Sequence, residues 1–205
     1  MITISRAMFH SVFICVLILM GGMSCVEVNI KAISGKKVDA QKKPLPPGFI
    51  GEIEVRTAAD ILLEPDDVKE ILKGANTVAD LFDGIGDTEC PMDLKIKPGG
   101  IPKFDAPQVI RDRHDLKELN DTYNGVKVVK RIRWCNKFWP NILGCQKYNG
   151  IVVVRTHSSQ EGVLWLHEYG HLRGLEHRNQ HNAVMNEFIG PTNTMLNDHE
   201  CNIYR

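Results

Sequence analysis

The sequence predicts an α+β domain with a mixed, twisted sheet and a small C-terminal subdomain, and three observations support this fold class. Two runs rich in β-branched residues, 126–134 and 150–155, are typical of buried strands. Apolar residues recur at helical spacing between Pro65 and Gly84. A histidine-rich segment then follows the second strand-like run and has the pattern of a helix that ends at a glycine. We therefore expect a sheet, the histidine-bearing helix directly after it, and a cleft between the sheet and the C-terminal part.

Length and composition indicate one folded domain. The 205-residue chain is 43% hydrophobic and carries 25 basic and 25 acidic side chains. This is enough apolar material for one ordinary core. A net charge of zero argues against a nucleic-acid partner, because such partners select for basic surfaces. We expect a monomer whose folded domain spans residues 49–205.

The N-terminus has the layout of a secretory signal peptide over residues 1–24. Arg6 precedes an apolar run from Ala7 to Met20, and the small-residue segment 21–24 follows. The run is too short to be interpreted first as a membrane-spanning helix, although an uncleaved membrane anchor is the alternative. We expect a secreted or extracytoplasmic protein.

Cys25 directly follows this segment and is a candidate for lipidation, which would anchor the protein to a membrane as a lipoprotein. Simple secretion is the alternative. Residues 25–48 contain clustered lysines and prolines but few large apolar residues, which is typical of an extended tether. Such a basic tether could contact an anionic membrane surface, although a solvated linker is the simpler interpretation.

Cysteine parity favours two disulfides. Removal of the two N-terminal cysteines, one with the signal peptide and one to a lipid, leaves four, an even number suited to an oxidising compartment. Four cysteines allow three pairing schemes. We prefer the scheme that pairs Cys135 with Cys145 and Cys90 with Cys201.

The first elements of the domain follow from local patterns. A strand is expected over 50–55 and could run on towards residues 62–63. Pro65 opens a helix, as proline does at first helical positions, and Gly84 closes it. Six residues form the apolar face of this helix: Val68, Ile71, Leu72, Ala75, Ala79 and Phe82.

Weaker signals complete the middle of the domain. Residues 94–96 form a short candidate strand, and a weakly helical stretch surrounds Leu116 and Leu119. The segment between the two strand-like runs, 135–149, is rich in turn-forming residues and predicts a loop.

Two helix caps are expected near the C-terminus. Ser158 or Ser159 can cap the histidine-bearing helix. Asn197, with Glu200 three residues later, has the spacing of a capping box and predicts a last helix.

One eleven-residue stretch reads His-Glu-x-x-His-x-x-Gly-x-x-His and begins at His167. His167 and His171 are four positions apart, so a helix presents their imidazoles side by side, one turn apart. Gly174 allows a sharp turn that returns His177 as a third nitrogen ligand. Three imidazoles suit Zn²⁺ and leave a fourth position open, as in catalytic sites. Glu168 can reach a metal-bound water without being a ligand, which predicts a general base.

These residues resemble the zinc signature of metzincin metalloproteases. Met185 follows His177 by eight residues, a spacing similar to the methionine turn of the matrixin branch, where a Met forms an apolar floor under the zinc. The resemblance implies a metzincin-like catalytic domain with one catalytic Zn²⁺. Some matrixins are kept latent by a zinc-bound thiolate, a role that Cys90 could take as the alternative to a disulfide. His181 is expected to be a surface residue, because His177 already satisfies the spacing of the third ligand.

The resemblance also implies where substrate binds. In metzincins an extended substrate pairs with the edge strand that precedes the zinc helix, a form of β-strand addition. We assign this role to five consecutive residues: Ile151, Val152, Val153, Val154 and Arg155. Phe188 and Ile189 follow Met185 and are expected to favour an apolar substrate side chain just past the cut.

The predicted function is that of a zinc-dependent endopeptidase that cleaves protein or peptide substrates through a metal-activated water, with Glu168 as the general base. Two alternatives come from other classes. One is a non-catalytic zinc-containing binding or inhibitor protein, against which the intact Glu168 argues. The other is a zinc hydrolase of short peptides or of cell-wall peptides.

Overall fold

A computed structural model describes residues 12–18, 22–28 and 49–205 of the chain, which separates into two units, Met1–Pro44 and Leu45–Arg205. In the first unit, β1 (Val12–Ile18) and β2 (Gly22–Val28) form an antiparallel hairpin in which Cys15 faces Cys25 in the register. The rest of the expected signal peptide and nearly all of the expected tether lie outside the described residues. None of the helices within the described ranges is long and apolar enough to cross a membrane.

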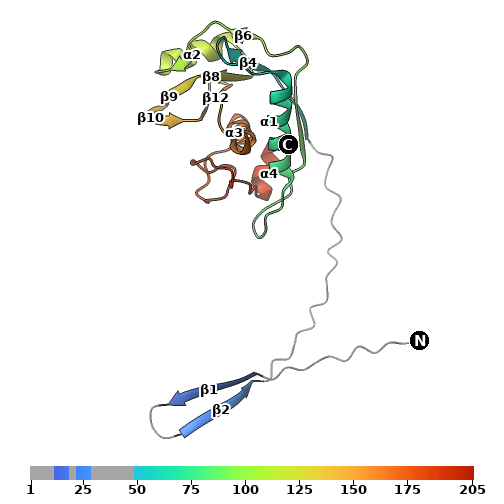
Figure 1. The fold of residues 1–205 in the computed structure, drawn as a ribbon, viewed down its shortest axis with the longest axis vertical. Coiled ribbons are helices and arrows are strands. Elements are labelled where there is room, and N and C mark those ends of the chain that lie inside the picture. The colour runs from blue at the N-terminus through green and yellow to red at the C-terminus, as the bar shows by residue number, and fades with distance from the viewer. Residues whose placement is uncertain (1–11, 19–21, 29–48) are drawn as a thin grey trace, which may run out of the picture. The chain divides into compact units, whose positions relative to one another are not determined.

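The second unit is built on a five-stranded sheet with the strand order β11-β12-β8-β4-β6 (Figure 1). Its strands are β4 (Val55–Ala58), β6 (Lys103–Phe104), β8 (Val126–Val129), β11 (Gly144–Lys147) and β12 (Gly150–Val154). All neighbouring strands are parallel except β11, which runs antiparallel to β12 at one edge. The sheet is therefore mixed, as expected from the sequence.

Two smaller sheets extend this framework. One has the order β10-β9-β7, and the other pairs β3 with β5 in parallel. Their strands are β3 (Phe49–Ile53), β5 (Met92–Ile96), β7 (Val109–Ile110), β9 (Arg131–Cys135) and β10 (Lys137–Ile142).

Four helices complete the second unit: α1 (Pro65–Asp80), α2 (Arg113–Thr122), α3 (Ser158–Leu172) and α4 (Asp198–Tyr204). Helix α1 packs against α3, as Figure 1 shows. The combination of several sheets with these helices places the domain in the α+β class. This part of the predicted fold class is confirmed.

The apolar core lies on both faces of the five-stranded sheet, because successive side chains of a strand point to opposite faces. Ile151 and Val153 of β12 pack into the cluster that includes α1 and α3, whereas Val152 packs into a second cluster with residues of α2. Strands β8 and β12 are covered on both faces, which explains why their sequences are continuous apolar runs without clear alternation.

Lys127 is the exception in this apolar run, because it is fully buried within β8. Its Nζ donates to the backbone carbonyl of Tyr123 at 3.3 Å. Burial removes water from the ammonium group and lowers the pKa of Lys127 to about 8. The sheet therefore contains a charge whose desolvation is only partly compensated.

Two predicted strands are each divided in the structure. The run 126–134 breaks at Lys130, whose backbone N–H donates to Gln108, so that β8 and β9 belong to different sheets. The first expected strand breaks at Glu54 and does not reach 62–63, and its two parts, β3 and β4, also enter different sheets. The local pattern could not locate these breaks, because they depend on partners that are distant in the sequence.

The segment 135–149 was expected to be a loop, and this was wrong because it contains β10 and β11. Tight turns connect these two strands to their neighbours. Asn136 (φ 61°) separates β9 from β10, and Tyr148 (φ 53°) with Asn149 (φ 61°) joins β11 to β12. Lys147 pairs with Gly150, so Tyr148 and Asn149 are the two loop residues of this hairpin.

The helix boundaries confirm some expectations and correct others. Pro65 begins α1 as expected, but α1 ends at Asp80, and Phe82 lies beyond it with 61% of its surface exposed. The capping residue of α3 is His157, not Ser158 or Ser159: its side chain accepts from the backbone N–H of Ser159. The capping box predicted at the start of α4 is present.

Both preferred disulfides are present. Cys90 pairs with Cys201 at a Cα–Cα distance of 5.4 Å, and Cys135 pairs with Cys145 at 5.8 Å. The first bridge joins the segment after α1 to the C-terminal helix. It also overturns the alternative role of Cys90 as a zinc-bound thiolate, because the sulfur is already bonded.

Candidate metal centre

Helix α3 carries the first two predicted ligands. His167 is buried and His171 is half-buried, and their ring centroids lie 4.6 Å apart with the ring planes at 89°. Both side chains leave the same helical face, because the two positions are four residues apart. The helix therefore places two imidazoles next to each other, as predicted.

The chain turns sharply after α3 and brings back the third ligand. Gly174 has φ +95°, a conformation that residues with a side chain rarely adopt. The backbone N–H of Leu175 donates to Gly170 at 2.9 Å and that of Gly174 to His171 at 3.0 Å, the two bonds of a Schellman motif. The ring of His177 then lies 4.6 Å from that of His171 and 5.3 Å from that of His167.

The hydrogen bonds of two histidines assign their tautomers. Nδ1 of His167 lies 2.8 Å from the carbonyl oxygen of Val184, and Nδ1 of His171 lies 2.7 Å from that of Leu175. A carbonyl can only accept, so each Nδ1 carries the proton and each Nε2 carries a lone pair, which for His171 points to Nε2 of His177. Burial lowers the pKa of His167 to about 3 and also lowers that of His171, which favours the neutral form that binds a metal.

These residues fit a metal ion. The ligand atoms of His167, His171 and His177 all lie within 4.8 Å of one another, and the Nε2 atoms of His171 and His177 are 3.0 Å apart. Two nitrogens bound to one tetrahedral Zn²⁺ are about 3.3 Å apart. Across the described ranges of the chain, this is the one group of His, Cys, Asp or Glu side chains whose ligand atoms converge in this way.

Glu168 follows His167 on α3 and is 3% exposed. Its Oε2 is buried without a hydrogen-bond partner among the described residues. Burial raises the pKa of Glu168 to about 8, although a backbone hydrogen bond from Gln146 acts in the opposite direction. A Cβ at Gly144 would collide with this carboxyl group, so the first residue of β11 is in direct contact with Glu168.

Met185 lies against α3 and is fully buried. A Cβ at Gly170 would come within 2.5 Å of both Met185 Sδ and the Tyr204 hydroxyl. That hydroxyl donates to the carbonyl of Leu166 at 3.0 Å and lies 3.3 Å from Met185 Sδ. Gly170, in the middle of the motif, therefore allows Met185 and α4 to pack closely against the helix that carries two ligands.

The expected substrate strand requires a correction. Ile151, Val152, Val153 and Val154 belong to β12, which is hydrogen-bonded to β11 on one side and to β8 on the other. Their backbone groups therefore cannot pair with a substrate. Arg155 forms an ion pair with Glu161 at 2.5 Å, at the start of α3. The edge strand is β11, which adjoins Glu168.

The loop after Met185 has one strongly exposed apolar residue. Phe188 is 80% exposed, whereas Ile189 is half-buried against the core. Glu187 lies 3.7 Å from Lys137 of β10, so this loop reaches the hairpin that precedes β11. His181 is exposed and does not belong to the imidazole cluster, as expected.

The cavities described in the domain lie elsewhere. The larger one, of about 770 Å³, lies between α1 and β5. A second, of about 280 Å³, lies between α1 and the start of α3. Neither is lined by the imidazoles, Glu168 or the loop after Met185, so neither adds a residue to the candidate metal centre.

Comparisons with known proteins do not extend this picture. No protein-family model matches the chain, and no curated protein is significantly similar to it.

Proposed function

We propose that the chain is a zinc-dependent endopeptidase of the metzincin type. One observation carries this proposal: two imidazoles from α3 and one from the turn after it converge, and Glu168, next to the first of them, is a buried carboxyl group whose Oε2 has no hydrogen-bond partner among the described residues. His167, His171 and His177 would hold the ion, and Glu168 would transfer the proton. A purely structural zinc site closes its fourth position with another protein ligand, and none of the described residues offers one here.

The surrounding fold supports the metzincin resemblance. The mixed sheet has an antiparallel edge strand, β11, in contact with Glu168, and α3 follows directly after β12. The C-terminal part is small and places Met185 against the helix that bears two of the ligands. These features support the proposal, with the difference that the edge strand is β11 and not the strand that directly precedes α3.

The chemistry follows from the donor set. A Zn²⁺ ion held by three neutral imidazoles supplies Lewis acidity, which lowers the pKa of a water ligand and polarises a carbonyl. Glu168 accepts a proton from the attacking water and returns it to the leaving amine. Its buried position keeps bulk water away from that proton. No nucleophilic side chain is required.

Strand β11 is the proposed binding site for the substrate backbone. It lies at the edge of the sheet, where no further strand of the described chain pairs with its outer N–H and C=O groups, although the backbone N–H of Gln146 already bonds to Glu168. Because Gly144 contacts Glu168, a peptide paired with β11 would lie near the proposed base. Phe188, exposed in the loop after Met185, is proposed to contact an apolar substrate side chain.

An extracytoplasmic location is part of the proposal. It is supported by two disulfides, because such bridges persist in oxidising compartments. Cleavage of residues 1–24 and lipidation of Cys25 are proposed on the sequence pattern alone.

The test is digestion of a denatured, unstructured protein substrate by the purified chain, with and without a chelator. Glu168→Gln is compared with Glu176→Gln, an exposed carboxylate within the same motif. We expect Glu168→Gln to lower kcat by about 10²- to 10⁴-fold while zinc content stays unchanged, and Glu176→Gln to resemble the unaltered protein.

Two results would contradict the endopeptidase assignment. Intact substrate in every reaction, with zinc bound, would favour the non-catalytic zinc protein. Cleavage of short peptides or of peptidoglycan, but never of a denatured protein, would favour the second alternative.

A further inference from the structure

Arg178 directly follows the third predicted ligand, and its backbone is held on both sides. Its N–H donates to the carbonyl of Met185 at 2.8 Å, and its carbonyl accepts from Nδ2 of Asn186 at 3.5 Å. These two bonds attach Arg178, the residue next to His177, to the turn that contains Met185. The position of His177 is therefore linked to that turn.

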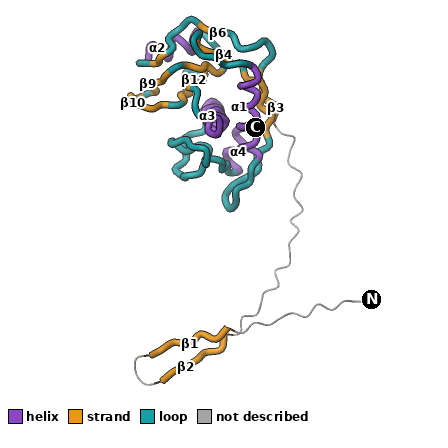
Figure 2. Tube along the Cα trace, in the orientation of Figure 1, coloured by secondary structure: helices purple, strands orange, loops and turns teal. Residues whose placement is uncertain are grey.

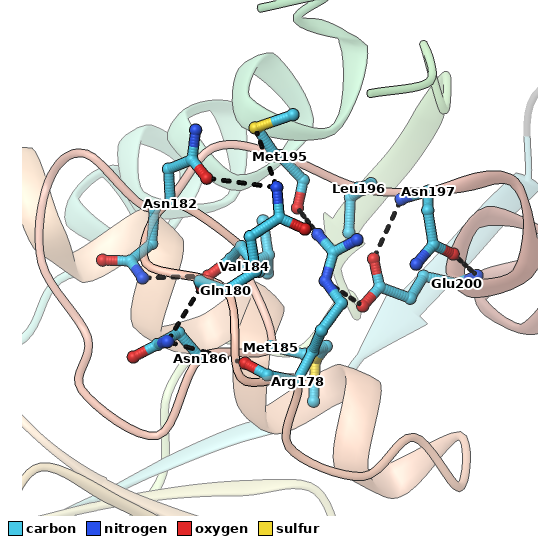
Figure 3. A network of polar contacts seen from close by, with 12 residues as sticks. Arg178, Gln180, Asn182, Val184, Met185, Asn186, Met195, Leu196, Asn197 and Glu200 are labelled. Atoms are coloured by element: carbon cyan, nitrogen blue, oxygen red, sulfur yellow. Dashed lines mark hydrogen bonds and ion pairs between the residues drawn. The ribbon is translucent and has the colours of Figure 1, made fainter. Parts of the chain in front are cut away.

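The side chain of Arg178 reaches further, to the segment before α4 and to α4 itself (Figure 3). Nη2 donates to the carbonyl of Met195 at 2.9 Å, and Nε lies 3.2 Å from Oε1 of Glu200. The exposed fractions of the two charged side chains are 20% and 5%. A shielded pair of this kind is screened much less than a surface ion pair, so it keeps more of its attraction, although Nε itself makes no hydrogen bond within the described residues.

Glu200 is itself firmly held. Its Oε2 accepts from the backbone N–H of Asn197 at 2.9 Å, within the capping box of α4. The next residue, Cys201, is bonded to Cys90. The guanidinium of Arg178 is thus anchored to a helix that is covalently attached to the segment after α1.

His177 needs such an anchor more than the other two ligands do. His167 and His171 are oriented by carbonyl groups that accept from their Nδ1 atoms. For His177, which is exposed, no carbonyl or carboxylate in the described part of the chain accepts from Nδ1. Apart from its contact with Nε2 of His171, its orientation depends on the backbone on which it sits.

The geometry points to Arg178 as a positioning residue for the third metal ligand, through which α4 and its disulfide hold His177 in place. This inference rests on the metal centre of the proposed function, not on the identity of its substrate. It predicts that metal affinity depends on a side chain that does not touch the metal.

The test uses the full chain and measures the affinity for Zn²⁺ by competition with a chelator. Arg178→Met is expected to weaken binding by about 10- to 100-fold, the usual effect of losing an outer residue that orients a ligand. Arg173→Met is the matched control, because Arg173 also donates to α4, at the carbonyl of Ile203, but follows a ligand that the helix already orients. We expect the control to stay within about twofold of the unaltered protein.

A double-variant cycle separates positioning from general destabilisation. In a His177→Ala background, Arg178→Met is expected to cause no further loss of Zn²⁺ affinity. The visible absorption of the Co²⁺-loaded Arg178→Met protein is expected to shift towards that of Co²⁺-loaded His177→Ala. Equal losses in both backgrounds, or an unchanged Co²⁺ spectrum, would overturn the positioning role.

Two further variants keep the test decisive if Arg178→Met does not fold. Arg178→Lys keeps a charge beside Glu200 but not the planar fork, and Glu200→Gln removes the charge pair while retaining a side chain that can accept from Asn197. Both are expected to weaken Zn²⁺ binding, and undiminished affinity in both would refute the inference. Absence of Zn²⁺ binding by the unaltered protein would instead overturn the metal centre and, with it, the proposed function.

Discussion

The two halves of the candidate metal centre are held by different means. His167, Glu168 and His171 lie on α3, one regular helix packed against α1 and the sheet. His177 and Met185 lie in a segment that Figure 2 draws as loop from the end of α3 to α4. We refer to these as the helical half and the loop half of the site.

The loop half replaces regular secondary structure with side chains that bond to the backbone. Asn193 binds three backbone groups, Asn186 binds two carbonyls and the N–H of Phe188, and Arg178 binds Met195. A single β-bridge, between Ala183 and Met195, supplements them. The comparison indicates that both halves pack apolar side chains into the core, and that the loop half adds side-chain hydrogen bonds to its backbone where the helical half has regular secondary structure.

The largest expected change in unfolding free energy distinguishes a buried predicted ligand from an exposed one in the metal-free protein. His167 is 2% exposed, so His167→Ala leaves a cavity and an unpaired Val184 carbonyl, and should cost about 4 kcal/mol of unfolding free energy. His177 is exposed, so His177→Ala should change stability by less than about 0.5 kcal/mol. Urea unfolding in the presence of a chelator measures both. Equal costs would remove the distinction between the two halves.

A second prediction concerns a buried charge in the sheet. Lys127 titrates at about pH 8 in the folded protein because burial disfavours its charged form, against 10.5 for the ordinary side chain. Below pH 8 both states are protonated and the penalty is fully present, about 3 kcal/mol at about 1.4 kcal/mol per pKa unit. Between pH 8 and 10.5 the unfolded state binds more protons, so stability rises with pH.

Lys127→Met should therefore stabilise the protein by about 3 kcal/mol at pH 7, and this gain should shrink towards zero as the pH approaches 10.5. Urea unfolding at several pH values measures the gain. Lys73→Met, at an exposed position of α1, is the control and should have little effect. A gain that is the same at pH 7 and pH 10.5 would show that packing, and not charge, is responsible.

The smallest expected change in unfolding free energy concerns the loop half, where removal of a buried polar side chain should destabilise the protein. Asn193 is 2% exposed, donates to the carbonyls of His181 and Ala183 at 3.0 and 2.9 Å, and accepts from Gly190 at 2.7 Å. Asn193→Ala should cost about 2 kcal/mol, because three backbone groups lose their partner. Thermal or urea unfolding against Asn179→Ala, an exposed asparagine, gives the measurement. A stability no lower than that of the control would contradict the role assigned to these bonds.

The site residues could be predicted from the sequence because their arrangement is local. The spacing of His167 and His171 is set by helical periodicity, and Gly174 permits the turn that returns His177. The disulfide preference also agreed with the structure, although parity alone left three schemes open. The strand β11 was missed because its sequence, Gly144–Lys147, lacks β-branched residues, and its pairing with β12 depends on the turn at Tyr148 and Asn149.

Local sequence therefore specified the helix, its turn and the order of the ligands, since these depend on neighbours within a few residues. The exposed edge of the sheet, the break at Lys130 and the anchoring of Arg178 by Glu200 emerged from the folded chain. Each of them joins residues that are far apart in the sequence. The pairing of strands and of charges depends on how the whole chain packs, and a short sequence pattern carries no information about this. For this reason the assignment of residues 151–155 as the substrate strand was wrong. The imidazoles of His167 and His171 on α3 nevertheless lie next to each other, as the motif predicted.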